Sequence, residues 1–218
     1  NMKITNGFTL AEILITLGII GVVAAITLPS IISNYKKQVI KTGFKKAYSV
    51  ISQAYNLAFT DLGYPTNCHY GDYGEGHQGS ECPLLKEAVE NRLQTVKICK
   101  GRIFSDGCVP EYTDQKSLGL SGGCVGMSRS ELEKYSTAYV LSDGLILFLY
   151  GTDTPSGIIG SPALIYADVN GQKGPNKWGH DVFGFKLITT TSDVPKIEPG
   201  SHCFINEDGA YDVEDIIN

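Results

Sequence analysis

A single carboxylate, Glu12, stands inside an otherwise uncharged and largely apolar run, residues 8–28. At about 1.5 Å per residue, such a run is long enough to cross a bilayer whose hydrocarbon core is roughly 30 Å thick. A charge within a span of this kind costs on the order of 2.5–3.5 kcal/mol, so it indicates a function and requires a partner. Glu12 is therefore the first candidate functional residue.

A second group that could do chemistry is rich in side-chain oxygen. Asp168, Asn170 and Gln172 alternate around Gly171, and Asp181 follows downstream. Loops with this alternation gather hard oxygen ligands for Ca²⁺. Asp168 and Asn170 would supply side chains, Gln172 a backbone carbonyl and Asp181 a closing carboxylate. The pattern lacks the terminal Glu of an EF-hand, and the alternative is an Asx-rich β-turn between two strands.

Six cysteines all follow the apolar run: Cys68, Cys82, Cys99, Cys108, Cys124 and Cys203. An even number in an exported region indicates disulfides, and three bridges allow fifteen connectivities. Local bridges are expected between Cys99 and Cys108, which enclose a short loop, and between Cys68 and Cys82. Cys124 and Cys203 then remain as the third pair. Metal thiolates are the alternative, but the chain has no Cys or His spacing typical of zinc sites.

Helical periodicity continues beyond the apolar run and predicts one helix over residues 8–60. Its part 8–32 is apolar all round, whereas 33–60 is amphipathic. Small and apolar residues form one stripe, and lysines line the other faces; the stripe comprises Val39, Gly43, Phe44, Ala47, Val50, Ile51, Ala54, Leu57 and Ala58. Pro29 lacks a backbone N–H, so a kink or an unwound stretch is expected between Gly21 and Pro29.

The rest of the chain predicts irregular structure followed by strands. Residues 61–136 are rich in glycine, with one short helix expected over 83–89. A hairpin with its turn at 142–144 follows, and residues 163–169 and 182–188 are two further strands. The expected fold class is α+β, with a long helix and an antiparallel sheet of about four strands.

The segment Gly7-Phe8-Thr9-Leu10-Ala11-Glu12 resembles the processing site of type IV pilins and type II secretion pseudopilins. Gly7, Phe8 and Glu12 match the positions that the family requires, and Gly21 and Pro29 fall where pilins commonly carry Gly and Pro. The resemblance implies cleavage after Gly7 by a prepilin peptidase and N-methylation of Phe8. It divides the chain into a leader (1–7), a long helix (8–60) and a globular pilin-like domain (61–218) with disulfide-tied loops. An ordinary signal anchor is the alternative.

The resemblance also implies a life cycle and a set of partners. The subunit would insert in the inner membrane with its C-terminal domain outside the cytoplasm, and then polymerise into a periplasmic or extracellular filament. Glu12 of one subunit would neutralise the new amino terminus of its neighbour, because a mis-registered subunit leaves both charges unpaired. The implied partners are other pilin subunits, prepilin peptidase, an inner-membrane assembly platform and membrane lipid before assembly. Major pseudopilins bind calcium in a loop of the globular domain, although the residues of this chain do not match that loop closely.

Other function classes have weaker support in the sequence. The formal net charge of −5 gives no indication of a nucleic-acid-binding surface. Ser142, Asp143 and His180 are the residues that a membrane-anchored periplasmic enzyme could use, but no nucleophile elbow, phosphate-binding loop or zinc signature accompanies them. A minor or tip subunit that binds a ligand through loops such as 70–79 would share the same leader. Pilus, secretion pseudopilus and DNA-uptake filament stay open.

Overall fold

The computed structural model describes residues 9–63, 68, 82–118, 128–150, 164–188, 195–200 and 206–217. It forms two compact units, Asn1–Val39 and Ile40–Asn218. The candidate residues Gly7, Phe8, Cys124 and Cys203 lie outside the described residues.

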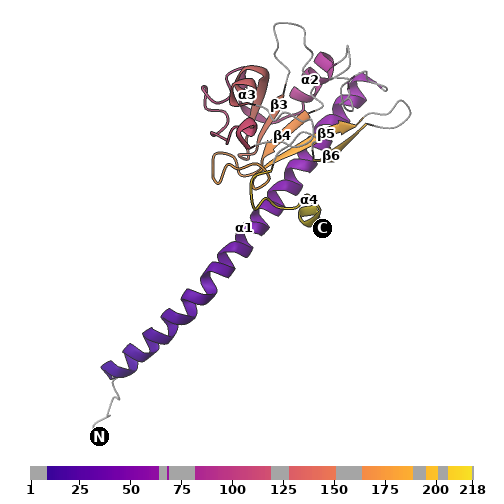
Figure 1. The fold of residues 1–218 in the computed structure, drawn as a ribbon. Coiled ribbons are helices and arrows are strands. Elements are labelled where there is room, and N and C mark those ends of the chain that lie inside the picture. Colours follow the sequence, from indigo (N-terminus) through magenta and orange to yellow (C-terminus); the bar gives the residue numbers. More distant parts are fainter. Residues whose placement is uncertain are drawn as a thin grey trace. The chain divides into compact units, whose positions relative to one another are not determined.

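Helix α1 extends over Leu10–Leu62, close to the predicted range (Figure 1). It is α-helical through Gly21 and Pro29, so the unwound stretch expected there is absent; a bend at Pro29 stays a prediction. Proline removes the ladder bond to the residue four positions earlier and its ring crowds that residue's carbonyl, a disturbance that a helix accommodates by bending without unwinding. The hydroxyl of Thr27 donates to the carbonyl of Val23 at 2.9 Å in the same turn region.

The part of α1 in the first unit exposes apolar side chains on every face. Leu10 and Ile26, for example, are 74% and 73% exposed. The hydroxyl of Thr16 donates to carbonyls of its own helix, so it presents no unpaired donor outward. By length and composition, α1 is able to cross a membrane. This surface requires a covering that the first unit does not supply.

The second unit contains a six-stranded antiparallel sheet in which the strand order follows the chain order. The strands are β1 (Thr95–Lys100), β2 (Ser136–Leu141), β3 (Ile146–Tyr150), β4 (Leu164–Asp168), β5 (Val182–Ile188) and β6 (Lys196–Pro199). The four predicted strands are confirmed as β2 to β5. Two strands were not predicted: β1, in the region expected to be irregular, and the four-residue β6. Both are edge strands that pair on one side only.

One face of the sheet packs against the C-terminal half of α1 (Figure 1). The buried α1 residues are Ile40, Phe44, Ala47, Ile51, Ala54, Tyr55, Ala58 and Phe59. The buried stripe is therefore rotated relative to the predicted one, and Leu57 is 49% exposed. The rotation brings Ile40, Tyr55 and Phe59, which the predicted stripe lacks, into the core. The ring of Phe44, already in that stripe, lies 5.0 Å from that of Phe183 and 5.3 Å from that of Phe185.

The opposite face of the sheet carries a second core beneath the segment that follows β1. Its aromatic members are Phe104, Tyr112, Phe148, Tyr166 and Trp178. Four short helices complete the described structure: α2 (Cys82–Glu90), η1 (Gln115–Leu118), α3 (Arg129–Tyr135) and α4 (Val213–Ile217). A long N-terminal helix on an antiparallel sheet with disulfide-tied loops is the pilin-like α+β architecture that the sequence predicts.

Candidate functional site

Glu12 closes a hydrogen-bonded cap at the start of α1. The backbone N–H and the hydroxyl of Thr9 both donate to Oε2 of Glu12 at 2.8 Å. The Glu12 N–H points back to the Thr9 hydroxyl oxygen at 3.3 Å. This reciprocal pattern is a capping box, with Thr9 as N-cap and Glu12 three positions later. The spacing Thr-x-x-Glu would have revealed this role, which the sequence analysis did not consider.

Asp168 and Asp181 mark the two ends of the β4–β5 loop, residues 168–181, and both are fully buried. Oδ2 of Asp168 accepts a hydrogen bond of 2.9 Å from the Tyr112 hydroxyl, and Oδ1 accepts one of 3.3 Å from the Asn170 N–H. The carboxylate oxygens of Asp181 accept from the N–H groups of Asn176 and Lys177, each at 2.7 Å. The Gly171 N–H also donates to Asp168, and the Asn170 side chain and the Asp181 N–H also donate to Asp181. All of these donors are uncharged, so none of them offsets the charge of either carboxylate.

The electrostatics of these two carboxyl groups are unfavourable. Burial raises the pKa of Asp168 to about 8, and the neighbouring charge of Asp181 adds to this effect. Burial also raises the pKa of Asp181. Within the described residues, neither group takes part in an ion pair. Two buried like charges without a counter-charge favour either a proton or a bound cation.

Two amide oxygens of the β4–β5 loop are buried without a hydrogen-bond partner, Oδ1 of Asn170 and Oδ1 of Asn176. The Asn170 side chain hydrogen-bonds to Asp181, and its Nδ2 also donates to the Gly174 carbonyl at 3.2 Å. The structure thus brings Asp168, Asn170 and Asp181 together and adds Asn176, while their role as metal ligands stays a prediction. Asn176 adopts a left-handed backbone with φ 56°, a tertiary detail that no spacing rule reports.

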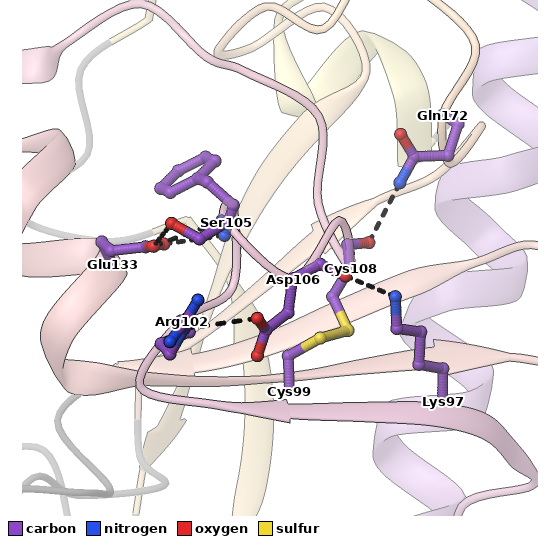
Figure 2. Close-up of a disulfide and its surroundings, with 9 residues drawn as sticks. Lys97, Cys99, Arg102, Ser105, Asp106, Cys108, Glu133 and Gln172 are labelled. Atoms are coloured by element: carbon purple, nitrogen blue, oxygen red, sulfur yellow. Dashed lines mark hydrogen bonds and ion pairs between the residues drawn. A yellow bond between two sulfur atoms is a disulfide. The ribbon is translucent and has the colours of Figure 1, made fainter.

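Gln172 has a different contact from the one that we considered. Its Nε2 donates to the carbonyl of Cys108 at 3.1 Å, as Figure 2 shows, and the ligand role of its own carbonyl stays a prediction. The described residues contain no group of three or more His, Cys, Asp and Glu side chains suited to a metal. The donors in the β4–β5 loop are therefore two carboxylates with amide oxygens, a set suited to a hard cation.

Both local disulfides expected from the sequence are present, Cys68–Cys82 and Cys99–Cys108. Their Cα atoms lie 4.9 Å and 6.1 Å apart. In Figure 2 the second bridge joins β1 to the end of the turn that follows it. The Lys97 ammonium donates to the Asp106 carbonyl, so this hydrogen bond and the disulfide both hold the turn to β1. Within the turn, Arg102 lies 3.3 Å from the Asp106 carboxylate.

The three residues considered for catalysis have separate partners. Asp143 forms an ion pair of 2.8 Å with Lys46 of α1. A ring nitrogen of His180 lies 3.1 Å from the Asp208 carbonyl. Among the described residues, no hydrogen bond or ion pair joins Ser142, Asp143 and His180 to one another.

Comparison with known proteins bears on the N-terminal segment. Residues 2–28 match the family model of the prokaryotic N-terminal methylation motif, which covers Gly7, Phe8 and Glu12. No curated protein matches the chain, and no solved structure matches it. The matched segment continues into an apolar helix long enough to cross a membrane. The chain therefore carries the prepilin signature of type IV pilins and pseudopilins, a family of structural filament subunits.

Proposed function

We propose that the chain is a structural subunit of a type IV pilus-like or type II secretion pseudopilus filament, cleaved after Gly7 and polymerised through α1. The observation that carries this proposal is the methylation motif at residues 2–28, which includes the apolar first part of α1. A helix that exposes apolar side chains on all faces is unfavourable in water. Inner-membrane lipid would cover this surface before assembly, and the helices of other subunits would cover it in the filament.

Glu12 has a defined chemical task in this proposal. Both hydrogen bonds from Thr9 go to Oε2, so Oε1 is the oxygen that remains for an ammonium group. Cleavage after Gly7 creates an amino terminus at Phe8. A neighbouring subunit in the correct register places this amine at Glu12, whereas a wrong register leaves two desolvated charges unpaired. The pair therefore acts mainly as a selector of register.

Intact-mass measurement of purified surface filaments tests this function. The subunit should begin at an N-methylated Phe8, and Gly7→Val should leave full-length precursor in the membrane because the side chain obstructs the peptidase. Gly18→Val is the matched control, since no atom lies within 4 Å of a Cβ placed there and the cleavage site is intact. Filaments whose subunits retain Met2 would contradict the proposal.

We also propose that the β4–β5 loop binds a structural Ca²⁺ ion. The residues that would hold it are Asp168, Asn170, Asn176 and Asp181. The fit rests on the two unpaired buried amide oxygens beside two buried carboxylates. When bound, the ion supplies the counter-charge that these groups lack. A plain Asx turn accounts for the contact between Asp168 and the Asn170 N–H, but it leaves the amide oxygens of Asn170 and Asn176 unexplained.

Thermal unfolding of the full chain in detergent, with Ca²⁺ or with chelator, tests the ion site. Calcium at 100 times its Kd should stabilise the fold by about 2.7 kcal/mol. Asp181→Asn should remove most of this gain, whereas Asp208→Asn, a change at an exposed acid, should keep it. If a chelator leaves the melting temperature unchanged while a reductant lowers it, the β4–β5 loop binds no stabilising ion and is a plain turn.

A further inference from the structure

The disulfide-bridged segment, residues 99–113, contacts the β4–β5 loop at three points. The side chain of Gln172 donates to the Cys108 carbonyl at 3.1 Å (Figure 2). The Trp178 indole N–H donates to the Thr113 carbonyl at 2.8 Å. Between these two contacts, the Tyr112 hydroxyl donates to Oδ2 of Asp168 at 2.9 Å. The conformation of one segment therefore bears directly on the other.

The Cys99–Cys108 bridge determines where this contacting segment lies. Cys99 belongs to β1, which is hydrogen-bonded into the sheet beside β2. Cys108 follows a tight turn in which its N–H and that of Val109 both donate to the Ile103 carbonyl, at 3.0 and 3.1 Å. Both sulfur-bearing side chains are buried. With the bridge closed, the chain leaves Cys108 in a fixed place only four residues before Tyr112.

Tyr112 connects this bridge to the ion site. Its side chain is 7% exposed, and its ring lies 5.1 Å from that of Trp178 and 5.9 Å from that of Phe148. The ring is thus held by packing, and its hydroxyl holds one oxygen of Asp168. Groups that orient a metal ligand in this way are commonly worth about 10–100-fold in metal affinity.

We propose that Tyr112, held in place by the Cys99–Cys108 disulfide, is a positioning residue for Asp168, so that disulfide formation and Ca²⁺ binding strengthen each other. This inference rests on the ion site proposed above. Bridge formation is a thiol–disulfide exchange: the Cys99 and Cys108 thiols give two electrons and two protons to a disulfide oxidant, whose own S–S bond becomes a dithiol. Because linkage is reciprocal, the factor by which the bridge raises Ca²⁺ affinity equals the factor by which Ca²⁺ favours the bridge.

The experiment uses the full chain in detergent and Tb³⁺ as a luminescent substitute for Ca²⁺, since both are hard cations with oxygen ligands. Trp178, the single tryptophan of the chain, lies in the β4–β5 loop, and its indole would sensitise a bound Tb³⁺ ion. Tyr112→Phe keeps the ring and removes the hydroxyl. It should weaken the binding of Tb³⁺, and of Ca²⁺ in competition with it, about tenfold. The double variant Cys99→Ser, Cys108→Ser should have a similar effect. The triple variant should bind the ions about as weakly as Tyr112→Phe alone, because the loss of the hydroxyl and the loss of the bridge both act through Asp168.

Two matched controls separate this route from a general loss of structure. Removing the other bridge with Cys68→Ser and Cys82→Ser should leave the ion affinity unchanged. Tyr48→Phe should also leave it unchanged, because the Tyr48 hydroxyl donates to the Ile197 carbonyl and not to a residue of the ion site. If a serine variant does not fold, titration of wild-type protein with a dithiol gives the same information. Ca²⁺ should then shift the Cys99–Cys108 equilibrium about tenfold and leave Cys68–Cys82 unaffected.

The outcomes distinguish the two proposals. Tb³⁺ binding with equal affinity in wild type, Tyr112→Phe and the serine variant would overturn the positioning role and leave the ion site standing. If Tyr112→Phe and the double serine change reduce ion affinity additively, the bridge and the Tyr112 hydroxyl do not act through the same contact with Asp168. Absence of ion binding to the oxidised wild type would overturn both the site and this inference.

Discussion

The backbone N–H and the hydroxyl of Thr9 both donate to the same oxygen of Glu12, Oε2, and each hydrogen bond is 2.8 Å long. The carboxylate therefore caps its own helix in addition to any part it has between subunits. Capping requires only a hydrogen-bond acceptor, whereas neutralising the amino terminus of a neighbour requires a negative charge. The two roles are separable by substitution.

Glu12→Gln should preserve the start of α1 and abolish assembly. Glutamine at this position still completes a capping box, but it carries no charge. Membrane insertion should be unchanged and filament yield should fall at least tenfold, as measured by shearing and immunoblotting of cells. Thr9→Val is the converse control: it removes cap hydrogen bonds worth about 0.5–2 kcal/mol and keeps the charge, so filaments should form. A wild-type yield from Glu12→Gln would refute the role of the charge.

Apolar runs bounded by turn residues predicted the central strands, because both faces of the sheet are buried and successive side chains of a strand point to opposite faces. In β3, for example, Leu147 and Leu149 face the α1 core, whereas Phe148 faces the second core. The edge strand β1 carries a weaker signal, since Val96 is 67% exposed and a bulge interrupts its pairing with β2. Neither edge strand has a second neighbour to impose a pattern.

The candidate ion site was predictable only in part. Asp168 and Asn170 are close in sequence, so their alternation around Gly171 is visible without a structure. Asn176 becomes a member of the site because its N–H bonds the Asp181 carboxylate and its backbone turns into the left-handed region. The contribution of Tyr112 comes from another segment of the chain, 56 positions before Asp168. Such contacts follow from tertiary packing and leave no local pattern.

Glu133 should give the domain a measurable dependence on acid. Burial opposes ionisation of Glu133, but hydrogen bonds from the Ser105 hydroxyl and from the N–H groups of Phe104 and Ser105 outweigh it and lower the pKa. This contribution to stability is complete above the unfolded pKa, about 4.3, and is lost as the pH falls through the lower folded value. Glu133→Gln should therefore cost about 1 kcal/mol at pH 7, with the difference from wild type shrinking below about pH 4.

Chemical denaturation at pH 7 and pH 3 measures this effect. Glu214→Gln, a change at an exposed carboxylate of α4, is the control and should shift stability by less than about 0.5 kcal/mol. A Glu133→Gln deficit of the same size at both pH values would show that the ionised form of Glu133 is not the stabilising one.

Gly171→Ala should destabilise the domain by more than about 2 kcal/mol. Gly171 has φ +67°, and a Cβ there would lie 2.3 Å from the Gly144 carbonyl oxygen, a backbone atom of the turn between β2 and β3. Gly174→Ala is a control within the same loop, since no atom lies within 4 Å of its Cβ position, and it should change stability by less than about 1 kcal/mol. Thermal unfolding of the full chain in detergent compares the two; equal melting temperatures would mean that the Gly171 contact is not close.

Ile51→Ala and Leu57→Ala should differ greatly although the deleted side chains are isomers. Ile51 is 1% exposed in the core between α1 and the sheet, whereas Leu57 is 49% exposed. Truncation of a buried Ile removes its transfer free energy and leaves a cavity, for a cost of about 2–5 kcal/mol. Truncation of an exposed Leu should cost less than about 0.5 kcal/mol. The measurement is chemical denaturation of monomeric protein in detergent, where contacts between subunits do not contribute. Both residues belong to the apolar stripe that the sequence predicts, so equal losses would favour that stripe, and a large loss at Ile51 alone would establish the rotated packing of α1.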